Sequence, residues 1–347
     1  MVENYGLPYA GSKSRIAHWV IDHLPRWRVL IDAFAGGCAI THRALLSHKW
    51  QTIIANDING KYPKLFLDAV KGKYRDEKRW ISREDFERLK SQDAFVACCF
   101  SFGNNLRYYM YPKEIEPYKR ALHYASVFDD FEPMQELMPE VAQAVGDALY
   151  GQNNLHDRRI TAQNIIVKTL KRLTGDNYAH PIIQSNPLYM SIRHSSRRND
   201  AQSLERLERL ERLQSLERLE SLQSLESLER LQSLESLERL QSLESLERLQ
   251  VTSQSYAEID IPEDAVVYCD PPYHASDNRL YEGTPSSFDY GAFYDWCVRV
   301  SKTNPIFISE YSIEDDRFEV VAEKQKITSM SSKKAFNVTE RLYTVKK

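Results

Sequence analysis

The pattern of hydrophobic and polar positions in the first sixty residues predicts an α/β arrangement. Residues 12–24 place apolar side chains at helical spacing, among them Ile16, Val20 and Leu24. Residues 28–37 (RVLIDAFAGG) form a short apolar strand that opens into a glycine turn, and residues 38–47 continue as a helix. Residues 51–60 form a second strand that ends in an acid. This order of elements is half of a nucleotide-binding fold.

The C-terminal part returns to the same kind of pattern. It predicts strands at 265–269 and 305–311, an amphipathic helix at 288–302, and closing strands within 318–327 and 340–347. Residues between the two parts mix helical segments with aromatic and basic stretches. We therefore expect four regions: 1–60 and 251–347 as two parts of one α/β sheet domain, 61–202 as a mainly helical insertion, and 203–250 as a repeat.

The repeat consists of sixteen uninterrupted triplets of the form Arg/Ser-Leu-Glu/Gln, within a higher period of nine residues, SLESLERLQ. A period of three matches neither a strand nor a coiled coil, and on an α-helix the leucine stripe winds around the axis. Ser, Glu and Arg are compatible with helix, so a helical extension is favoured and a solenoid of nine-residue coils is the alternative. The segment is interpreted as an inert linker, a self-association surface, or the product of a tandem 27-nucleotide tract that changes length in frame.

Composition indicates the cellular environment of the protein more than its function. The 347-residue chain has five cysteines with no disulfide or zinc spacing, which favours a reducing, cytoplasmic environment. It has no signal peptide pattern and no apolar run long enough for a membrane span. The net charge of −3 becomes +1 when the repeat is left out, so total charge argues neither for nor against nucleic-acid binding. His180 and His194 show no ligand spacing, and no metal site is predicted.

The glycine turn and the following acid are candidates for a nucleoside site. Gly36 and Gly37 permit a sharp turn and a close approach of a ligand to the backbone. Asp57 lies 21 residues after Gly36, where an acid accepts hydrogen bonds from ribose hydroxyls. Cys38 stands where a third glycine is often found, which favours a nucleoside without a pyrophosphate. A strand-turn-helix whose glycines serve geometry alone remains the alternative.

The stretch AVVYCDPPY (265–273) places an acid, two prolines and a ring directly after an apolar strand. Asp270 is expected in the ligand crevice at the strand's carboxyl end. Pro271 and Pro272 fix the backbone and aim its carbonyl groups outward, and Tyr273 offers a face on which a base can stack. Together they describe a clamp for the exocyclic amine of an aromatic base. A proline turn capped by an acid is the alternative.

These residues resemble a known family. PYAGSK (8–13), DAFAGG (32–37), NDIN (56–59) and DPPY (270–273) are similar, in the same order, to the motifs of Dam-like N6-adenine DNA methyltransferases. The resemblance covers 1–200 and 251–347 and excludes the repeat. It implies a Rossmann-like methyltransferase sheet, S-adenosylmethionine as cofactor, and transfer of a methyl group to the N6 amine of an adenine flipped out of double-stranded DNA.

The resemblance also assigns roles to individual residues. Tyr9 and Lys13 would line the methionine end of the cofactor, although Lys13 also reads as a surface lysine. The cofactor set is Tyr9, Lys13, Asp32, Phe34, Ala35, Gly36, Gly37 and Asp57, and the catalytic set is Asp270, Pro271, Pro272 and Tyr273. Tyr256 is a weaker candidate for the pocket and is better explained as a core residue.

The insertion would read DNA. Asn104, Asn105 and Arg107 carry groups that read base edges, and Tyr108, Tyr109 and Tyr111 can stack or wedge beside a flipped base. Arg193, Arg197 and Arg198 could contact phosphates, although a solvated basic loop is the better explanation of 193–198. Two rival functions remain: a methyltransferase of the same fold acting on RNA or a protein glutamine, and a catalytically silent DNA-binding or assembly protein. The target sequence and any partner restriction enzyme of a restriction-modification system are not encoded in these motifs.

Overall fold

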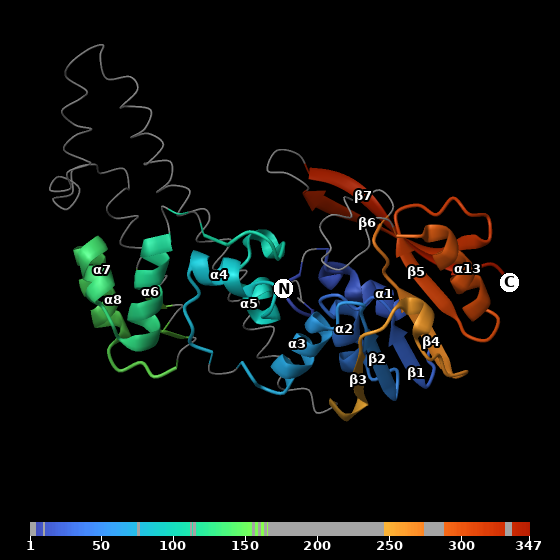
Figure 1. Ribbon diagram of the computed structural model, residues 1–347, viewed down its shortest axis with the longest axis horizontal. Coiled ribbons are helices and arrows are strands. Elements are labelled where there is room, and N and C mark those ends of the chain that lie inside the picture. Colours follow the sequence, from blue (N-terminus) through green and yellow to red (C-terminus); the bar gives the residue numbers. More distant parts are fainter. Residues whose placement is uncertain are drawn as a thin grey trace, which may run out of the picture. The chain divides into compact units, whose positions relative to one another are not determined.

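The computed structural model describes residues 5–9, 11–74, 77–111, 113, 116–154, 157–158, 161–162, 165, 246–273, 288–329 and 335–347. Its centre is a seven-stranded sheet with the order β3-β2-β1-β4-β5-β7-β6 (Figure 1). The strands are β1 (Val29–Asp32), β2 (Thr52–Asn56), β3 (Leu249–Thr252), β4 (Ala265–Cys269), β5 (Ile306–Glu310), β6 (Phe318–Ser329) and β7 (Ala335–Val345). The mixed α/β sheet predicted for the two ends of the chain is confirmed.

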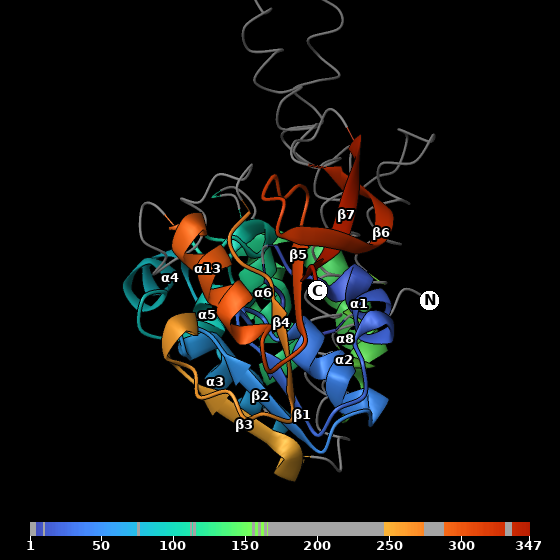
Figure 2. The same ribbon diagram turned by 90° about the vertical axis from the view of Figure 1, so that its right-hand side faces the viewer.

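Strands β1 to β5 pair in parallel, and β7 runs antiparallel to both β5 and β6. All residues of β1 and β4 are buried, as expected for central parallel strands that are covered on both faces. Alternate residues of β1, β4 and β5 pack against Phe293, Trp296 and Cys297 of helix α13 (Tyr290–Val300). Helices α1 (Ala17–His23) and α2 (Ala39–Ser47) cover the opposite face of the sheet (Figure 2).

The other described helices lie between β2 and the repeat in sequence. They are α3 (Lys61–Val70), α4 (Arg83–Leu89), α5 (Ala94–Cys99), α6 (Glu116–Phe128), α7 (Glu132–Leu137) and α8 (Pro139–Leu149). The described part of this segment contains these six helices, and the helical character of the whole insertion stays a prediction. Among the helices that the structure describes, none combines the length and hydrophobicity that a membrane span requires.

The last residues of the leucine repeat belong to the sheet. Strand β3 begins at Leu249, one residue before the predicted end of the repeat at 250, and pairs with β2 from Ile53 onward. Leu249 is buried, and the guanidinium of Arg248 donates to the backbone carbonyl of Leu45 at 2.9 Å and to that of Trp50 at 3.0 Å. The final repeat unit therefore contributes the first two residues of an edge strand and its anchor. Repeat residues before 246 lie outside the described residues.

A buried asparagine fixes the register of this edge strand. The Nδ2 group of Asn56 donates to the carbonyls of Ala33 and Gln254, at 3.1 and 3.0 Å. Its Oδ1 atom accepts from the hydroxyl of Thr252 at 2.8 Å and from the backbone N–H of Gln254 at 3.1 Å. One side chain thus joins β1, β2 and the end of β3, and all of its hydrogen-bonding groups have partners.

The chain divides into two compact units. Among the described residues, the first unit holds those up to 77, then 86–108, and everything from 246 onward. The second unit holds 78–85 and the described residues from 109 to 165. Residues 61–77 and 86–108, which were predicted as part of the insertion, therefore group with the sheet, and helix α4 spans the point where the chain leaves the second unit for the first.

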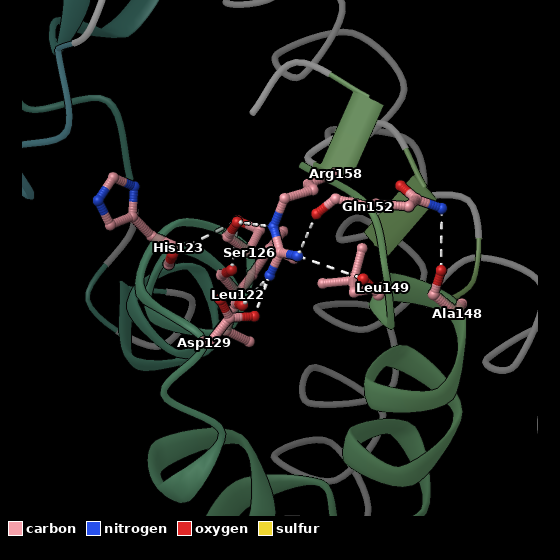
Figure 3. Close-up of polar contacts among 9 residues, drawn as sticks. Leu122, His123, Ser126, Asp129, Ala148, Leu149, Gln152 and Arg158 are labelled. Carbon is pink, nitrogen blue, oxygen red and sulfur yellow. Dashed lines mark hydrogen bonds and ion pairs between the residues drawn. The ribbon is translucent and has the colours of Figure 1, made fainter. Parts of the chain in front are cut away.

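The second unit is a small helical core closed by one buried arginine. Ala121, Ala125, Met134, Val145 and neighbouring apolar residues of α6, α7 and α8 form the core. The guanidinium of Arg158 donates to the carbonyl of Ser126 at 2.9 Å, that of Leu149 at 3.2 Å and that of Gln152 at 2.8 Å, and it pairs with Asp129 (Figure 3). A cation at the carboxyl ends of two helices satisfies carbonyls that helix geometry leaves without partners.

Replacing Arg158 by methionine should destabilise the helical unit. Methionine keeps much of the buried volume but leaves the carbonyl groups without their donors, so we expect a loss of about 3 kcal/mol in the free energy of unfolding. The measurement is urea denaturation of the full chain followed by circular dichroism. Arg120→Met on the exposed side of α6 is the matched control. If R158M unfolds at the same urea concentration as R120M, Arg158 is not a structural anchor.

Candidate active site

Three acids meet at one edge of the sheet. Asp32 ends β1, Asp57 follows β2, and Asp270 follows β4. Because these three strands are adjacent and parallel, their carboxyl ends open onto the same edge, where α/β sheets bind ligands (Figure 1). The sequence predicted all three positions, and the structure brings them to one place.

The glycine turn after β1 packs against the N-terminal segment. The N–H of Leu7 donates to the carbonyl of Gly37 at 2.7 Å, which lays the following residues along the turn. A Cβ atom on Gly37 would lie 2.6 Å from the Cβ of Tyr9, and one on Gly36 would lie 3.4 Å from the Tyr9 ring. Tyr9 and the two glycines, predicted to share the cofactor site, are therefore in direct contact, and Gly37 has no room for a side chain.

Asp57 is joined to the same turn. Its carboxylate accepts from the N–H of Gly36 at 2.9 Å and from the N–H of Asn59 at 2.8 Å. Burial raises the pKa of Asp57, while these two hydrogen bonds lower it. Each carboxylate oxygen has a second lone pair, so the group can still accept from a ribose. The ribose role itself stays a prediction.

Asp32 carries a buried carboxyl oxygen that is not satisfied. Its Oδ2 atom accepts from the hydroxyl of Thr41 at 2.7 Å and from the N–H of Thr41 at 3.2 Å, which ties β1 to α2. Its Oδ1 atom has no hydrogen-bond partner among the described residues. Burial is the main cause that raises the pKa of Asp32 to about 7. A cationic or N–H donor bound beside the glycine turn would complete this carboxyl group.

The acid of the DPPY stretch is paired with a lysine from the N-terminal motif. Asp270 is 18% exposed, and its Oδ1 atom lies 2.8 Å from the Nζ of Lys13, which is 8% exposed. The same Nζ lies 4.4 Å from the centre of the Tyr273 ring. Lys13 is thus buried against the Asp270 carboxylate and the Tyr273 ring, so it is not a solvent-exposed surface lysine. Whether it also lines the methionine end of a cofactor stays a prediction.

The backbone of the DPPY stretch is held from helix α13. The hydroxyl of Tyr290, the first residue of that helix, donates to the carbonyl of Pro272 at 2.6 Å. Tyr273 is buried, its ring meets that of Tyr311 edge to face at 4.6 Å, and its hydroxyl donates to Glu340 of β7. Burial, reinforced by the charges of Asp270 and Glu340, raises the pKa of Tyr273, so the hydroxyl stays protonated. The ring is therefore fixed on several sides.

Three other candidates from the sequence pack in or against the interior: Ala35 is buried, and Phe34 and Tyr256 are partly buried. Phe34 meets the rings of Tyr256, Phe288 and Phe293, with ring centres 5.6 to 6.0 Å apart. Tyr256 belongs to the same aromatic cluster, as a core tyrosine would. Ala35 is buried, and its N–H donates to the carbonyl of Asn56 at 2.8 Å. These contacts give Phe34 and Ala35 a structural task, whatever part they take in binding a cofactor.

The candidate DNA-reading residues lie on a loop of unusual backbone conformation. Asn104 and Leu106 both have positive φ angles, of 55° and 64°. The Oδ1 atom of Asn105 accepts from the N–H groups of Arg107 and Tyr108, at 2.8 and 3.0 Å. The Oδ1 atom of Asn105 therefore stabilises the loop and does not contact a base. Tyr108 is 68% exposed, so its ring is presented to solvent as a stacking residue requires. Tyr109 and Tyr111, also predicted to stack, are buried, so the prediction is wrong for these two residues.

Sequence reasoning missed several residues at this edge, and Glu340 is the most important of them. It is fully buried on β7, on the same side of the strand as Leu342. The alternation in VTERLYTV carries the signal, because it places an acid on the apolar face of a strand. Tyr290, which supports the DPPY backbone, gave no comparable signal, and the NDIN motif that contains Asn56 did not indicate that this residue fixes the register of β3.

Some predicted features cannot be placed. Arg193, Arg197 and Arg198 lie outside the described residues, as does the repeat up to 245 with its expected helical extension and self-association. Within the described part of the chain, no three His, Cys, Asp or Glu side chains are grouped so that they could hold a metal ion.

Comparison with known proteins agrees with the motifs. Residues 9–127 match the family of D12 class N6 adenine-specific DNA methyltransferases. The matched range contains Lys13, the glycine turn, Asp57 and the loop that carries Tyr108, and it ends before Asp270. A search of curated proteins finds no match to the chain. The match over residues 9–127 supports the assignment of the protein as an adenine-specific DNA methyltransferase of this class.

Proposed function

We propose that the protein transfers a methyl group from S-adenosylmethionine to the N6 amine of an adenine flipped out of double-stranded DNA, at a specific target sequence. The observation that carries the proposal is the Asp270 carboxylate at the end of β4, next to the buried ring of Tyr273 and across the sheet edge from the glycine turn and Asp57. The proposed acceptor, stacking ring and nucleoside-binding residues follow adjacent parallel strands at one edge of the sheet, which supports an amine-directed methyl transfer.

The residues around the glycine turn fit the cofactor. Asp57 would accept from the ribose, and Gly36 and Gly37 place no side chain of their own on the turn, where the Tyr9 ring lies against the backbone and would line the same site. The unsatisfied Oδ1 atom of Asp32 would accept from the ammonium of the cofactor's methionine part. When bound, the cofactor supplies an electrophilic methyl group on a positively charged sulfur.

Asp270 and the backbone beside it would orient the amine. The carboxylate and the carbonyl of Pro271 are two acceptors that suit the two N–H bonds of an exocyclic amine. Holding both bonds turns the nitrogen lone pair out of conjugation with the ring and toward the methyl group. The C–S bond breaks as the N–C bond forms, and the surplus proton leaves through Asp270 or water. Catalysis in this scheme rests on positioning.

The exposed Tyr108 ring and the half-exposed Arg107 support contact with DNA. An aromatic ring on a constrained loop can stack on a base or occupy the space left by an extruded one.

The absence of a membrane-spanning helix in the described residues is consistent with a cytoplasmic place of action in a bacterial or phage-infected cell, which we propose together with this function.

A labelled-methyl assay tests the function. The full chain is incubated with methyl-tritiated S-adenosylmethionine and, separately, plasmid DNA from a host without adenine methylation, total RNA, and protein extract. We expect tritium in DNA, recovered as N6-methyldeoxyadenosine after digestion to nucleosides. Tritium only in RNA or protein would show that the amine lies in another polymer. No transfer to any of them would identify a DNA-binding or assembly protein without activity.

A further inference from the structure

Glu340 is a buried acid to which the proposed mechanism gives no part. It lies on β7 in the C-terminal hairpin and has no exposed surface. Burying a carboxylate is costly unless positive charges or hydrogen-bond donors compensate for the lost water. Two groups of the active site do so: the hydroxyl of Tyr273 donates to its Oε1 atom, and the Nζ of Lys13 lies 3.9 Å from the same atom.

Lys13 therefore lies between two carboxylates. Its Nζ is 2.8 Å from Asp270, 3.9 Å from Glu340 and 4.4 Å from the centre of the Tyr273 ring. The ammonium thus makes the closer ion pair with Asp270. In the proposed function, the target amine donates to Asp270 while its base lies against the Tyr273 ring. In this structure the Lys13 ammonium occupies that place.

The base and the lysine compete for one acceptor. For the amine to reach Asp270, the ammonium of Lys13 has to withdraw, and in a buried site it cannot withdraw to a place without a counter-charge. Among the described residues, Glu340 is a second carboxylate close to the ammonium, with 3.9 Å between its Oε1 atom and Nζ. Its bond to the Tyr273 hydroxyl keeps it, and the ring, in place while the flexible lysine side chain moves.

We propose that Glu340 is a positioning residue of the methyltransferase: it receives the Lys13 ammonium when the target amine takes Asp270, and it holds the Tyr273 ring on which the base stacks. This inference rests on the proposed function, because it concerns the same clamp. It assigns a purpose to the C-terminal hairpin, which lies after all of the sequence motifs and delivers Glu340 to the site.

The test compares two variants that separate charge from shape. Glu340→Gln keeps the shape and an acceptor for Tyr273 but removes the charge, so Lys13 stays on Asp270. We expect kcat on plasmid DNA to fall about tenfold, while KM for DNA and the Kd for S-adenosylmethionine stay within about twofold. Glu340→Asp keeps the charge and should retain more activity than E340Q. If Glu340 serves packing alone, the isosteric E340Q should be the more active of the two.

Glu323→Gln is the matched control, because Glu323 lies on the neighbouring strand β6, is 52% exposed and pairs with Arg341. Its kinetic constants should equal those of the wild type. The second readout is coupling to Lys13. In a Lys13→Met background there is no ammonium to receive, so adding E340Q should change kcat by less than about twofold. The same tenfold loss in both backgrounds would overturn the proposal, and so would an unchanged kcat for E340Q.

Thermal melting of each variant guards against unfolding. If E340Q does not fold, the same comparison is made with E340D in the wild-type and K13M backgrounds. A fall in kcat in the wild-type background alone supports the proposal. Equal falls in both backgrounds, or no fall in either, contradict it. Absence of methyl transfer by the wild type would refute the proposed function. Wild-type transfer combined with a normal E340Q would refute only the role of Glu340.

Discussion

Replacing Asp270 by alanine is expected to abolish methyl transfer to DNA, with a fall in kcat of about 10³-fold, while the protein still binds S-adenosylmethionine. The variant loses the acceptor that orients the amine. It also removes the counter-charge closest to the buried Lys13 ammonium, whose Nζ lies 2.8 Å from Asp270 Oδ1 in the wild type. The glycine turn and Asp57 lie on neighbouring strands and are untouched, so the cofactor should still bind.

The measurement pairs tritium transfer to plasmid DNA with calorimetric titration of the cofactor. Asp264→Ala is the matched control, since Asp264 directly precedes β4 whereas Asp270 directly follows it. Asp264 is 43% exposed and pairs with Arg28 at the amino end of the strand, away from the ligand edge. D264A should transfer methyl groups like the wild type. Normal turnover by D270A would show that the clamp has been assigned to the wrong residue.

Deleting nine residues from the end of the repeat should leave the enzyme unchanged, whereas deleting eight should destabilise it. Removal of 242–250 brings SLESLERLQ of residues 233–241 directly before Val251, so the same side chains enter β3. Removal of 243–250 puts Gln241 at the buried position of Leu249 and Leu240 at the position of Arg248. A shift of one residue moves each side chain to the other face of a strand.

The eight-residue deletion is therefore expected to cost about 2–4 kcal/mol, from the lost burial of Leu249, the buried amide and the lost anchor of Arg248. Its melting temperature should fall by about 5–10 °C relative to the nine-residue deletion. The register cannot follow the shift freely, because Asn56 holds Thr252 and Gln254. Equal melting temperatures for the two deletions would show that the repeat contributes nothing specific to the sheet.

The sequence predicted the elements that depend on local pattern. The strand before the glycine turn, Asp57 after the next strand and Asp270 after β4 follow from apolar runs ending in turn residues, and the motif order predicted that they share one edge. The sequence did not predict that β3 begins inside the repeat. Identical triplets carry no strand alternation, and Leu249 becomes extended because the open edge of β2 offers hydrogen-bond partners far away in sequence.

The polar contacts of the site could also not be predicted from the sequence. Lys13 and Asp270 are separated by more than 250 residues, so only the closed sheet shows that they form an ion pair. The same holds for Glu340, whose burial depends on Tyr273 and on the C-terminal hairpin packing beside β5. For Asn105, the residue type suggested base reading, but the turn itself uses its carbonyl oxygen.

The most direct measurement is a crystal structure of the protein with S-adenosylhomocysteine and a duplex that contains its target site, identified beforehand by sequencing modified bases. The account predicts an extruded adenine whose N6 atom lies about 3 Å from the Asp270 carboxylate, with its ring against Tyr273 and Lys13 moved toward Glu340. An adenine that remains stacked in the duplex, or is bound in a pocket away from Asp270, would contradict it.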